Sequence, residues 1–206
     1  MGSFNSSLGC ASVRYPTLAR IRFEVRLSMN TKISFLTDIV TSRLRLRCFE
    51  KDDAPFVLRL LNEPSFHEFI GDRGVRTLDD AVGYLERGPM ASYAQHGHGL
   101  MHVSLMDGTP IGMCGILRRD GLEHPDVGFA LAPEHWGCGY TLEASRAVIT
   151  HARSVLGIGT LLAITAPHNL RSMRVLEKLG FSLTETRVLT AGATPVNVFR
   201  SDKMSL

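Results

Sequence analysis

Two glycines, Gly137 and Gly139, fall between a strand-like segment and a helical one, and this placement constrains the fold more than any other feature of the sequence. Residues 126–131 before them are mostly apolar and indicate a strand. Residues 142–156 after them repeat apolar side chains at three- and four-residue spacing, which predicts an amphipathic helix. The chain should therefore contain a strand, a short glycine loop and a helix in direct succession.

The loop Trp136-Gly137-Cys138-Gly139-Tyr140-Thr141 would bring its backbone N–H groups to the start of that helix. A helix N-terminus leaves N–H groups unpaired and carries partial positive charge, and glycines let a phosphate approach closely. The same two glycines also suit an ordinary tight turn, so the surroundings must decide. No Gly-Lys-Ser/Thr follows, which disfavours an NTPase loop. A dinucleotide fold is disfavoured too, because it would require a third glycine and a later acidic residue.

The rest of the chain alternates between strand and helix patterns without an internal repeat, which predicts one α+β or α/β domain around a mixed sheet. Between the first two helices, residues 66–71 are rich in bulky side chains and are predicted to be an irregular segment that lines a cleft. The predicted strands are 43–47, 100–105, 110–117, 126–131, 161–166, 183–189 and 196–200, and the predicted helices are 54–61, 77–87, 142–156 and 170–179.

A length of 206 residues suits one domain, which we place at residues 37–206. Residues 1–36 are predicted to be a disordered or non-core extension, because the first thirty are rich in Ser and Arg and lack a clear apolar period. Three interpretations of this segment compete: a transit peptide, an N-myristoylation start at Met1-Gly2, or an extension upstream of a second start at Met29. We favour the last.

Charge and cysteine usage exclude several classes of partner. The net charge of +3 comes from four arginines and one glutamate in the first thirty residues, so the domain itself is neutral and lacks the basic stripe of a nucleic-acid binder. The four cysteines are far apart, which suits a reduced, cytoplasmic protein. No apolar run reaches the roughly 18–20 residues that span a bilayer, so we expect no membrane embedding.

The stretch from Val127 to Ala144 resembles the acetyl-CoA-binding motif of the GNAT family of N-acetyltransferases, in the branch that includes ribosomal-protein N-terminal acetyltransferases. Residues 41–47 and 169–181 resemble the same family, and the likeness covers about residues 41–200. It implies a mixed sheet that splays open, with acetyl-CoA in the gap and no metal. The implied reaction is direct attack on the thioester by a primary amine, which belongs either to a small molecule or to a protein N-terminus.

The resemblance also implies which residues bind the donor. Trp136, Thr141 and Cys138 depart from the general family pattern, and Cys138 stands where a cation is frequent, which predicts somewhat weaker binding. Glu143 and Trp136 are interpreted as supports of the loop. The expected cofactor-binding residues are Val127, Gly128, Phe129, Leu131, Trp136, Gly137, Cys138, Gly139, Tyr140, Thr141, Asn169 and Ser172.

Catalytic roles are predicted less sharply. A tyrosine often serves as acid in this superfamily, but its position here is Leu176, so Ser172 becomes the candidate that approaches the sulfur, with helix packing or cofactor contact as the alternative. Asp126 is the first choice for the base, followed by Glu68 and His67. The resemblance implies that main-chain N–H groups of residues 127–129 hold the oxyanion.

Three further expectations concern the histidines, the alternative functions and the acceptor. His96, His98 and His102 have no acid or cysteine companions and are interpreted as surface histidines rather than metal ligands. A non-catalytic acyl-CoA sensor and a nucleotide-binding regulatory domain are alternative functions. The acceptor should be selected by residues 62–74 and 87–99, and the open sheet would permit a homodimer.

Overall fold

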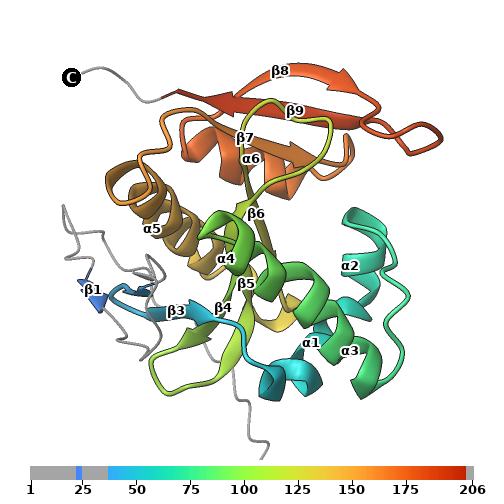
Figure 1. The fold of residues 1–206 in the computed structure, drawn as a ribbon. Helices are drawn as coiled ribbons and strands as arrows, with labels where there is room; N and C mark the ends of the chain where they lie inside the picture. Colours follow the sequence, from blue (N-terminus) through green and yellow to red (C-terminus); the bar gives the residue numbers. More distant parts are fainter. Residues whose placement is uncertain (1–21, 25–36, 203–206) are drawn as a thin grey trace, which may run out of the picture.

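The computed structural model describes residues 22–24 and 37–202, which form a mixed nine-stranded sheet in the order β1-β2-β3-β4-β5-β6-β7-β9-β8 (Figure 1). All neighbouring strands are antiparallel except β6 and β7. The strands are β1 (Arg22–Glu24), β2 (Asp38–Val40), β3 (Leu44–Cys48), β4 (Leu100–Leu105), β5 (Pro110–Leu117), β6 (Asp126–Leu131), β7 (Leu161–Thr165), β8 (Ser182–Arg187) and β9 (Val196–Ser201).

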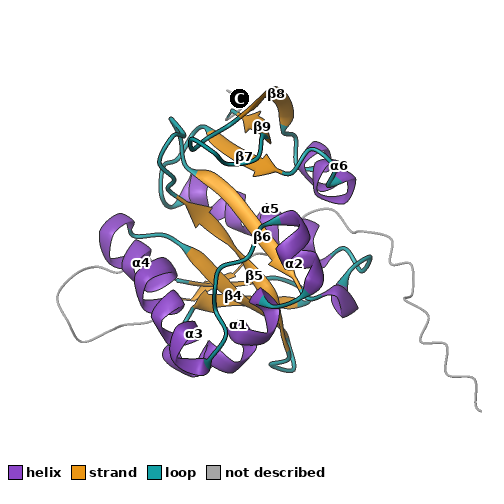
Figure 2. Cartoon of the chain, turned by 90° about the vertical axis from the view of Figure 1, so that its right-hand side faces the viewer, coloured by secondary structure: helices purple, strands orange, loops and turns teal. Residues whose placement is uncertain are grey.

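Helices cover both faces of the sheet. Figure 2 shows α1 and α3 together on the side that faces the viewer, and α5 behind the strands. Met113 and Cys114, neighbours in β5, belong to different core clusters, because successive side chains of a strand point to opposite faces. The helices are α1 (Ala54–Leu61), α2 (Pro64–Phe69), α3 (Leu78–Leu85), α4 (Ala91–His96), α5 (Tyr140–Ser154) and α6 (Leu170–Lys178), with shorter turns η1 (Lys51–Asp53), η2 (Glu86–Met90) and η3 (Pro133–His135).

The sheet opens between its two parallel strands. β6 pairs with β5 along its whole length, from Asp126 opposite Leu117 to Leu131 opposite Gly112. It pairs with β7 at one position, where Asp126 lies opposite Leu162 at the start of both strands. The strands therefore diverge toward their carboxyl ends. Because the glycine loop and α5 follow the carboxyl end of β6, the open end of the sheet and the N-terminus of α5 lie together. The predicted splayed α+β domain is confirmed.

Two local predictions were wrong. Residues 66–71 are not irregular throughout, since α2 occupies Pro64–Phe69, with Pro64 in its favoured place at the helix start. The second helix does not stop at Gly88-Pro89. The α-helix α3 ends at Leu85, and the chain continues through the π-helical turn η2 into α4. The N–H of Ala91 donates a hydrogen bond to the carbonyl of Glu86. Pro89 has no N–H to donate, and this wider turn absorbs the break.

The N-terminal segment is described only in part. Arg22–Glu24 adds β1 to the sheet edge by pairing with Asp38–Val40. The other residues of the predicted extension, on which the three interpretations of the N-terminus rest, lie outside the described residues. Among the residues that are described, no helix has the length and apolar character needed to cross a bilayer.

Candidate active site

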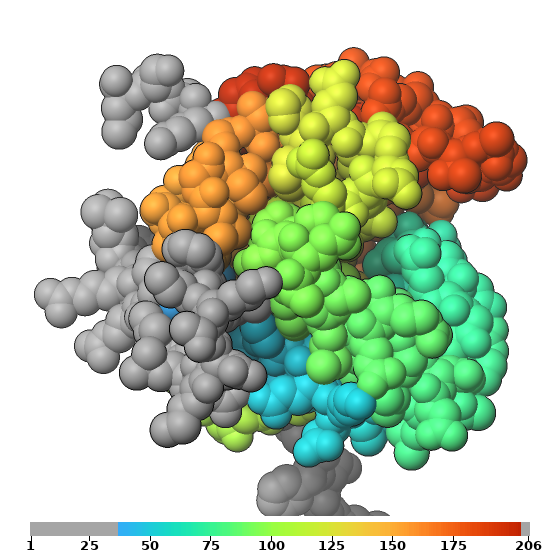
Figure 3. All heavy atoms as spheres, viewed as in Figure 1, coloured from blue at the N-terminus to red at the C-terminus, as the bar shows by residue number. Residues whose placement is uncertain are grey.

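A cavity of about 670 Å³ lies at the opening between β6 and β7. Its walls come from β6, the glycine loop, β7, α6 and the α1–α2 corner. Figure 3 shows the face seen in Figure 1, with the teal segment around α2 at its right-hand side, below the orange and red C-terminal strands. Segments far apart in the sequence thus surround one space.

The glycine loop adopts the conformation that its sequence predicts. Gly137 and Gly139 have φ of +77° and +80°, in the left-handed region that glycine occupies without steric cost. Gly139 is the N-cap of α5. Its carbonyl accepts the first hydrogen bond of the helix, from the N–H of Glu143. The N–H groups of the preceding residues therefore have no acceptor inside the helix. This is the geometry of an anion-binding helix N-terminus.

Trp136 lies at the junction of loop and cavity. Its indole Nε1 donates a hydrogen bond of 2.7 Å to the carbonyl of Leu131, which fixes the ring at the end of β6. The guanidinium of Arg171 lies over the ring, 5.2 Å from its centroid, and both residues line the cavity. The position of this arginine, on α6 and over Trp136, was not predicted from the sequence.

Glu143 holds the loop to β3. Its Oε1 accepts hydrogen bonds from the Thr41 hydroxyl at 2.6 Å and from the Arg43 backbone N–H at 3.1 Å. Its Oε2 pairs with Arg43, which also donates to the carbonyl of Cys138 and lies over the Tyr140 ring. Burial would raise the pKa of Glu143, but the bonds from Thr41 and Arg43 outweigh it and lower that pKa. The carboxylate is therefore held ionised and occupied by the loop.

The predicted donor-binding residues divide into two groups. Nine of them line the cavity: Val127, Gly128, Phe129, Leu131, Trp136, Gly137, Thr141, Asn169 and Ser172. Cys138, Gly139 and Tyr140 do not, since the Cys138 carbonyl accepts from Arg43 and the Tyr140 ring faces the same guanidinium. The contacts of Cys138 and Tyr140 with Arg43 support the loop, and Gly139 is the N-cap of α5.

The start of α6 forms the opposite wall. Asn169 caps this helix, its Oδ1 accepting from the Ser172 N–H at 3.0 Å. Ser172 is half-buried and lines the cavity, while its hydroxyl takes no part in the cap. Leu176 is buried and lines the same cavity, so an apolar side chain occupies the place where the resemblance expects a phenol.

The residues predicted as bases do not reach the cavity. Asp126 is fully buried, and Arg119 donates to both its carboxylate oxygens at 3.1 and 2.9 Å. Burial raises the pKa of Asp126, and Arg119 opposes that shift. Glu68 is exposed on α2, and His67 faces Asp72 with 3.8 Å between Nε2 and Oδ1. None of the three lines the cavity, so their selection is not supported by position.

The carboxylate that does line the cavity is Glu63. Its sequence context, Asn62-Glu63-Pro64, reads as the end of a helix, and no pattern there indicates a ligand. The cationic residues Arg174 and Lys178 of α6 also line the cavity and were not predicted. Their spacing with Arg171 places them on one face of a helix, which is the signal that could have found them.

The histidine prediction was wrong in one position. His102 is buried, with its ring edge-on to Phe49 and Phe56. Burial lowers its pKa to about 4, Arg47 adds to that shift, and Asp53, 3.9 Å away, opposes it. His96 is exposed and stacks on the half-buried His98. In the described part of the chain, no group of three or more His, Cys, Asp or Glu side chains is arranged to hold a metal.

A mixed sheet that opens between two parallel strands, with the unpaired N–H groups of a helix N-terminus at the opening, is the arrangement that the resemblance implies for an acyl-group transferase. Comparison with known proteins narrows that class, because the model of the acetyltransferase (GNAT) domain matches residues 43–182. The chain belongs to this family and is an N-acetyltransferase.

Individual relatives agree with this assignment. YkkB of Bacillus subtilis (strain 168) is 31% identical over 166 residues, which cover 77% of this chain and 90% of YkkB. An acetyltransferase from Agrobacterium tumefaciens str. C58 is similar in structure, with a TM-score of 0.69 and 26% identity over 85% of this chain and 98% of that one. RimL, a ribosomal L7/L12 alpha-N-protein acetyltransferase in complex with coenzyme A, is similar in structure with a TM-score of 0.69 and 15% identity. The match covers 79% of this chain and 96% of RimL, and this similarity supports the fold alone.

Proposed function

We propose that the protein transfers acetyl from acetyl-CoA to a primary amine, with the donor in the cavity between β6 and β7. The observation that carries this proposal is the combination of an open N-terminus on α5 with a cavity that continues from Gly137 along Val127–Leu131. Backbone N–H groups at the start of α5 suit the pyrophosphate, and the edge of β6, which β7 leaves unpaired beyond Asp126, suits the amide groups of the pantetheine arm.

The side chains around the donor have separable tasks. Trp136, Gly137 and Thr141 form the phosphate end, whereas Asn169 and Ser172 lie on the facing wall toward the pantetheine. Main-chain N–H groups within residues 127–129 are the proposed oxyanion donors. Successive N–H groups of a strand alternate in direction, so those of Val127 and Phe129 face the edge that β7 leaves unpaired, whereas that of Gly128 faces β5. Arg171, Arg174 and Lys178 supply the positive charge that Cys138 does not.

The reaction we propose is direct attack. The amine nitrogen, in its unprotonated form, forms a bond to the thioester carbon, and the carbon–sulfur bond breaks as the CoA thiolate leaves. The nitrogen loses one proton, which ends on the thiolate or in solvent, so that the products are a neutral amide and CoA. A thiol has an ordinary pKa of about 8.5, so the thiolate is a tolerable leaving group and Leu176 in place of a phenol does not prevent the reaction. Ser172 is the proposed hydrogen-bond donor to the sulfur, because it is the hydroxyl that α6 presents to the cavity.

The acceptor is proposed only as a primary amine, on a small molecule or at a protein N-terminus. We propose that the acceptor enters at the α1–α2 corner. The residues of this corner line the cavity but lie far in sequence from the donor motif. We also propose a cytoplasmic location, supported by the wide separation of the cysteines. The four cysteines occupy positions 10, 48, 114 and 138, and no two of them are near each other in the sequence.

Calorimetric titration with acetyl-CoA, followed by measurement of free-thiol release over a panel of amines and N-terminal peptides, tests this function. Binding together with amine-dependent release is the expected result, and the amine that accelerates release identifies the acceptor. A chain that does not bind acetyl-CoA would contradict the placement of the donor at Trp136–Thr141. Binding with no release over the whole panel would contradict the proposed acceptor class.

A further inference from the structure

Charged side chains are distributed unevenly around the cavity. Four of the residues that line it carry formal charge, and three of them, Arg171, Arg174 and Lys178, are cations on α6. Arg171 lies over Trp136, next to the glycine loop, so its charge serves the phosphate end. The fourth is Glu63, which joins α1 to α2 on another wall. The cavity therefore has cations toward the donor and one carboxylate at the corner assigned to the acceptor.

The Glu63 carboxylate has no partner among the described residues. Glu63 is the N-cap of α2, but its side chain makes no capping bond; its carbonyl accepts instead from the N–H groups of Phe66 and His67, at 2.9 and 3.2 Å. No ion pair or side-chain hydrogen bond of the described chain includes it. The residue is half-buried. Its carboxylate oxygens are not among the buried side-chain atoms that lack a partner, so this unpaired negative charge remains accessible to a cation that enters the cavity.

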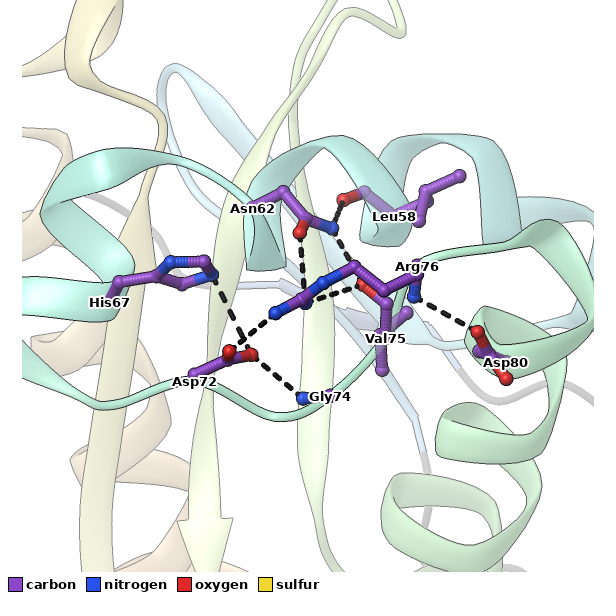
Figure 4. Close-up of polar contacts among 8 residues, drawn as sticks. All are labelled: Leu58, Asn62, His67, Asp72, Gly74, Val75, Arg76 and Asp80. Atoms are coloured by element: carbon purple, nitrogen blue, oxygen red, sulfur yellow. Dashed lines mark hydrogen bonds and ion pairs between the residues drawn. The ribbon is translucent and has the colours of Figure 1, made fainter.

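The corner that carries Glu63 is held in place by polar contacts (Figure 4). The preceding residue, Asn62, donates from Nδ2 to the carbonyls of Leu58 and Val75 at 2.8 and 2.9 Å. Arg76 donates to Asn62 Oδ1 at 3.1 Å and pairs with Asp72. These contacts tie the end of α1 to the segment before α3. These contacts therefore hold the backbone at Glu63 beside the cavity wall.

The surroundings of this carboxylate are apolar. Leu60 of α1, Phe66 and Phe69 of α2, and Ile70, which follows α2, line the cavity near this corner. Phe69 also meets the ring of His168, just before α6, with 5.6 Å between ring centroids, so α2 reaches the opposite wall. An ammonium group beside Glu63 would have its hydrocarbon body against aromatic and aliphatic side chains. Both parts of such a ligand would then find matching surroundings.

We propose that Glu63 binds the ammonium group of the acceptor, and that acceptors are primary amines carried on an apolar or aromatic body. The inference rests on the proposed function, since it places this amine beside a donor held by Trp136 and α6. It assigns recognition to a residue that belongs to neither the donor motif nor the start of α6. Release of the proton before attack is a separate step, which the binding assignment does not include.

The test is calorimetric. The full chain is first saturated with CoA and then titrated with phenethylammonium chloride at neutral pH. We expect Glu63→Gln to weaken binding of this amine about tenfold or more, as the loss of one charge-assisted hydrogen bond does, and to leave CoA affinity unchanged. Glu68→Gln is the matched control, because Glu68 is on the same helix but outside the cavity wall. 2-Phenylethanol, the neutral analogue, should not distinguish Glu63→Gln from wild type.

Each other outcome overturns a definite part of the proposal. Equal amine binding by the wild type and Glu63→Gln, or equal losses in Glu63→Gln and Glu68→Gln, would remove Glu63 from the acceptor site. Wild-type protein that binds CoA but not phenethylammonium would contradict the acceptor class. Failure of the wild type to bind CoA would instead contradict the proposed function, and this inference with it. Unchanged CoA affinity in Glu63→Gln also shows that the variant is folded.

Discussion

Arg43 and Glu143, 100 residues apart in the chain, form a two-pronged ion pair, with 2.7 Å from Nε and 2.6 Å from Nη2 to the same Oε2. Arg43 precedes β3 and Glu143 lies in the first turn of α5, so the pair joins the edge of one strand to the glycine loop. The same guanidinium donates to the Cys138 carbonyl. The loop conformation is thereby set by a residue far from it in sequence.

Removing the charge of Glu143 should loosen the loop. We expect Glu143→Gln to lower the free energy of unfolding by about 1–3 kcal/mol, because a partly buried guanidinium is left without its counter-charge. Acetyl-CoA affinity should fall in parallel. The control is Glu134→Gln, whose partner Arg59 is exposed, and which should cost less than about 1 kcal/mol. Urea unfolding of both variants provides the comparison, and equal losses would contradict a special role for Glu143.

Buried His102 predicts a loss of stability on mild acidification. Its folded-state pKa of about 4 lies below the unfolded value near 6.5, so the neutral ring stabilises the fold above pH 6.5 and that contribution is lost as pH falls toward 4. Linkage gives a loss of about 2 kcal/mol between pH 7 and 5. Burial would raise the pKa of nearby Asp53, but the Arg47 guanidinium and the backbone N–H of Glu50 donate to its carboxylate and lower that pKa. Asp53 therefore remains ionised in this window.

The measurement for His102 is urea unfolding at pH 7 and pH 5, with His102→Gln as reference. Glutamine does not titrate, so the difference between the two proteins isolates the histidine from Asp126 and other carboxyls. We expect the pH-dependent loss to be smaller in the variant by about 2 kcal/mol. Parallel pH dependences would show that His102 does not titrate differently in the folded chain.

Ser172→Ala tests the proposed contact with the sulfur. The cap of α6 uses the backbone N–H of residue 172, so the substitution keeps the bond to Asn169. We expect kcat to fall about tenfold, a modest effect because the thiolate leaves without much assistance, while acetyl-CoA affinity changes little. With a thioester whose thiol is more acidic, the difference in kcat between Ser172→Ala and wild type should be smaller, because the thiolate needs less assistance to leave. A loss confined to binding would assign Ser172 to donor contact alone.

Local features of the fold were predictable from sequence, whereas features that depend on distant partners were not. The strand, glycine loop and helix around Gly139 follow from apolar spacing and backbone freedom within about twenty residues. The helix α2 was missed because its six residues gain their order from packing of Phe66 against the core. The π-helical turn at Pro89 was missed because a proline there ordinarily ends a helix.

The candidate site shows the same division. Asp126 was chosen as a base because it begins the donor strand β6, but Arg119, seven residues earlier, donates to both oxygens of its carboxylate across the turn between β5 and β6. Glu63 looked like a helix boundary and lines the cavity. Spacing cannot distinguish a carboxylate that already has a partner from one that lacks it, because the partner is chosen by tertiary structure.

Arg171 provides the last prediction, on how the donor is held without a cation at Cys138. Its guanidinium lies over the Trp136 ring, and Arg171 and Gly137 both line the cavity, in which a pyrophosphate would meet the start of α5. We expect Arg171→Ala to weaken acetyl-CoA binding about five- to tenfold, with a shallower dependence on salt, because one cation–phosphate contact is lost. S-acetylpantetheine, which lacks the phosphates, should be used equally well by variant and wild type. Arg146→Ala, on the exposed side of α5, is the matched control, since Arg146 does not line the cavity. An equal loss with both donors would mean that Arg171 supports the shape of the cavity rather than the phosphates.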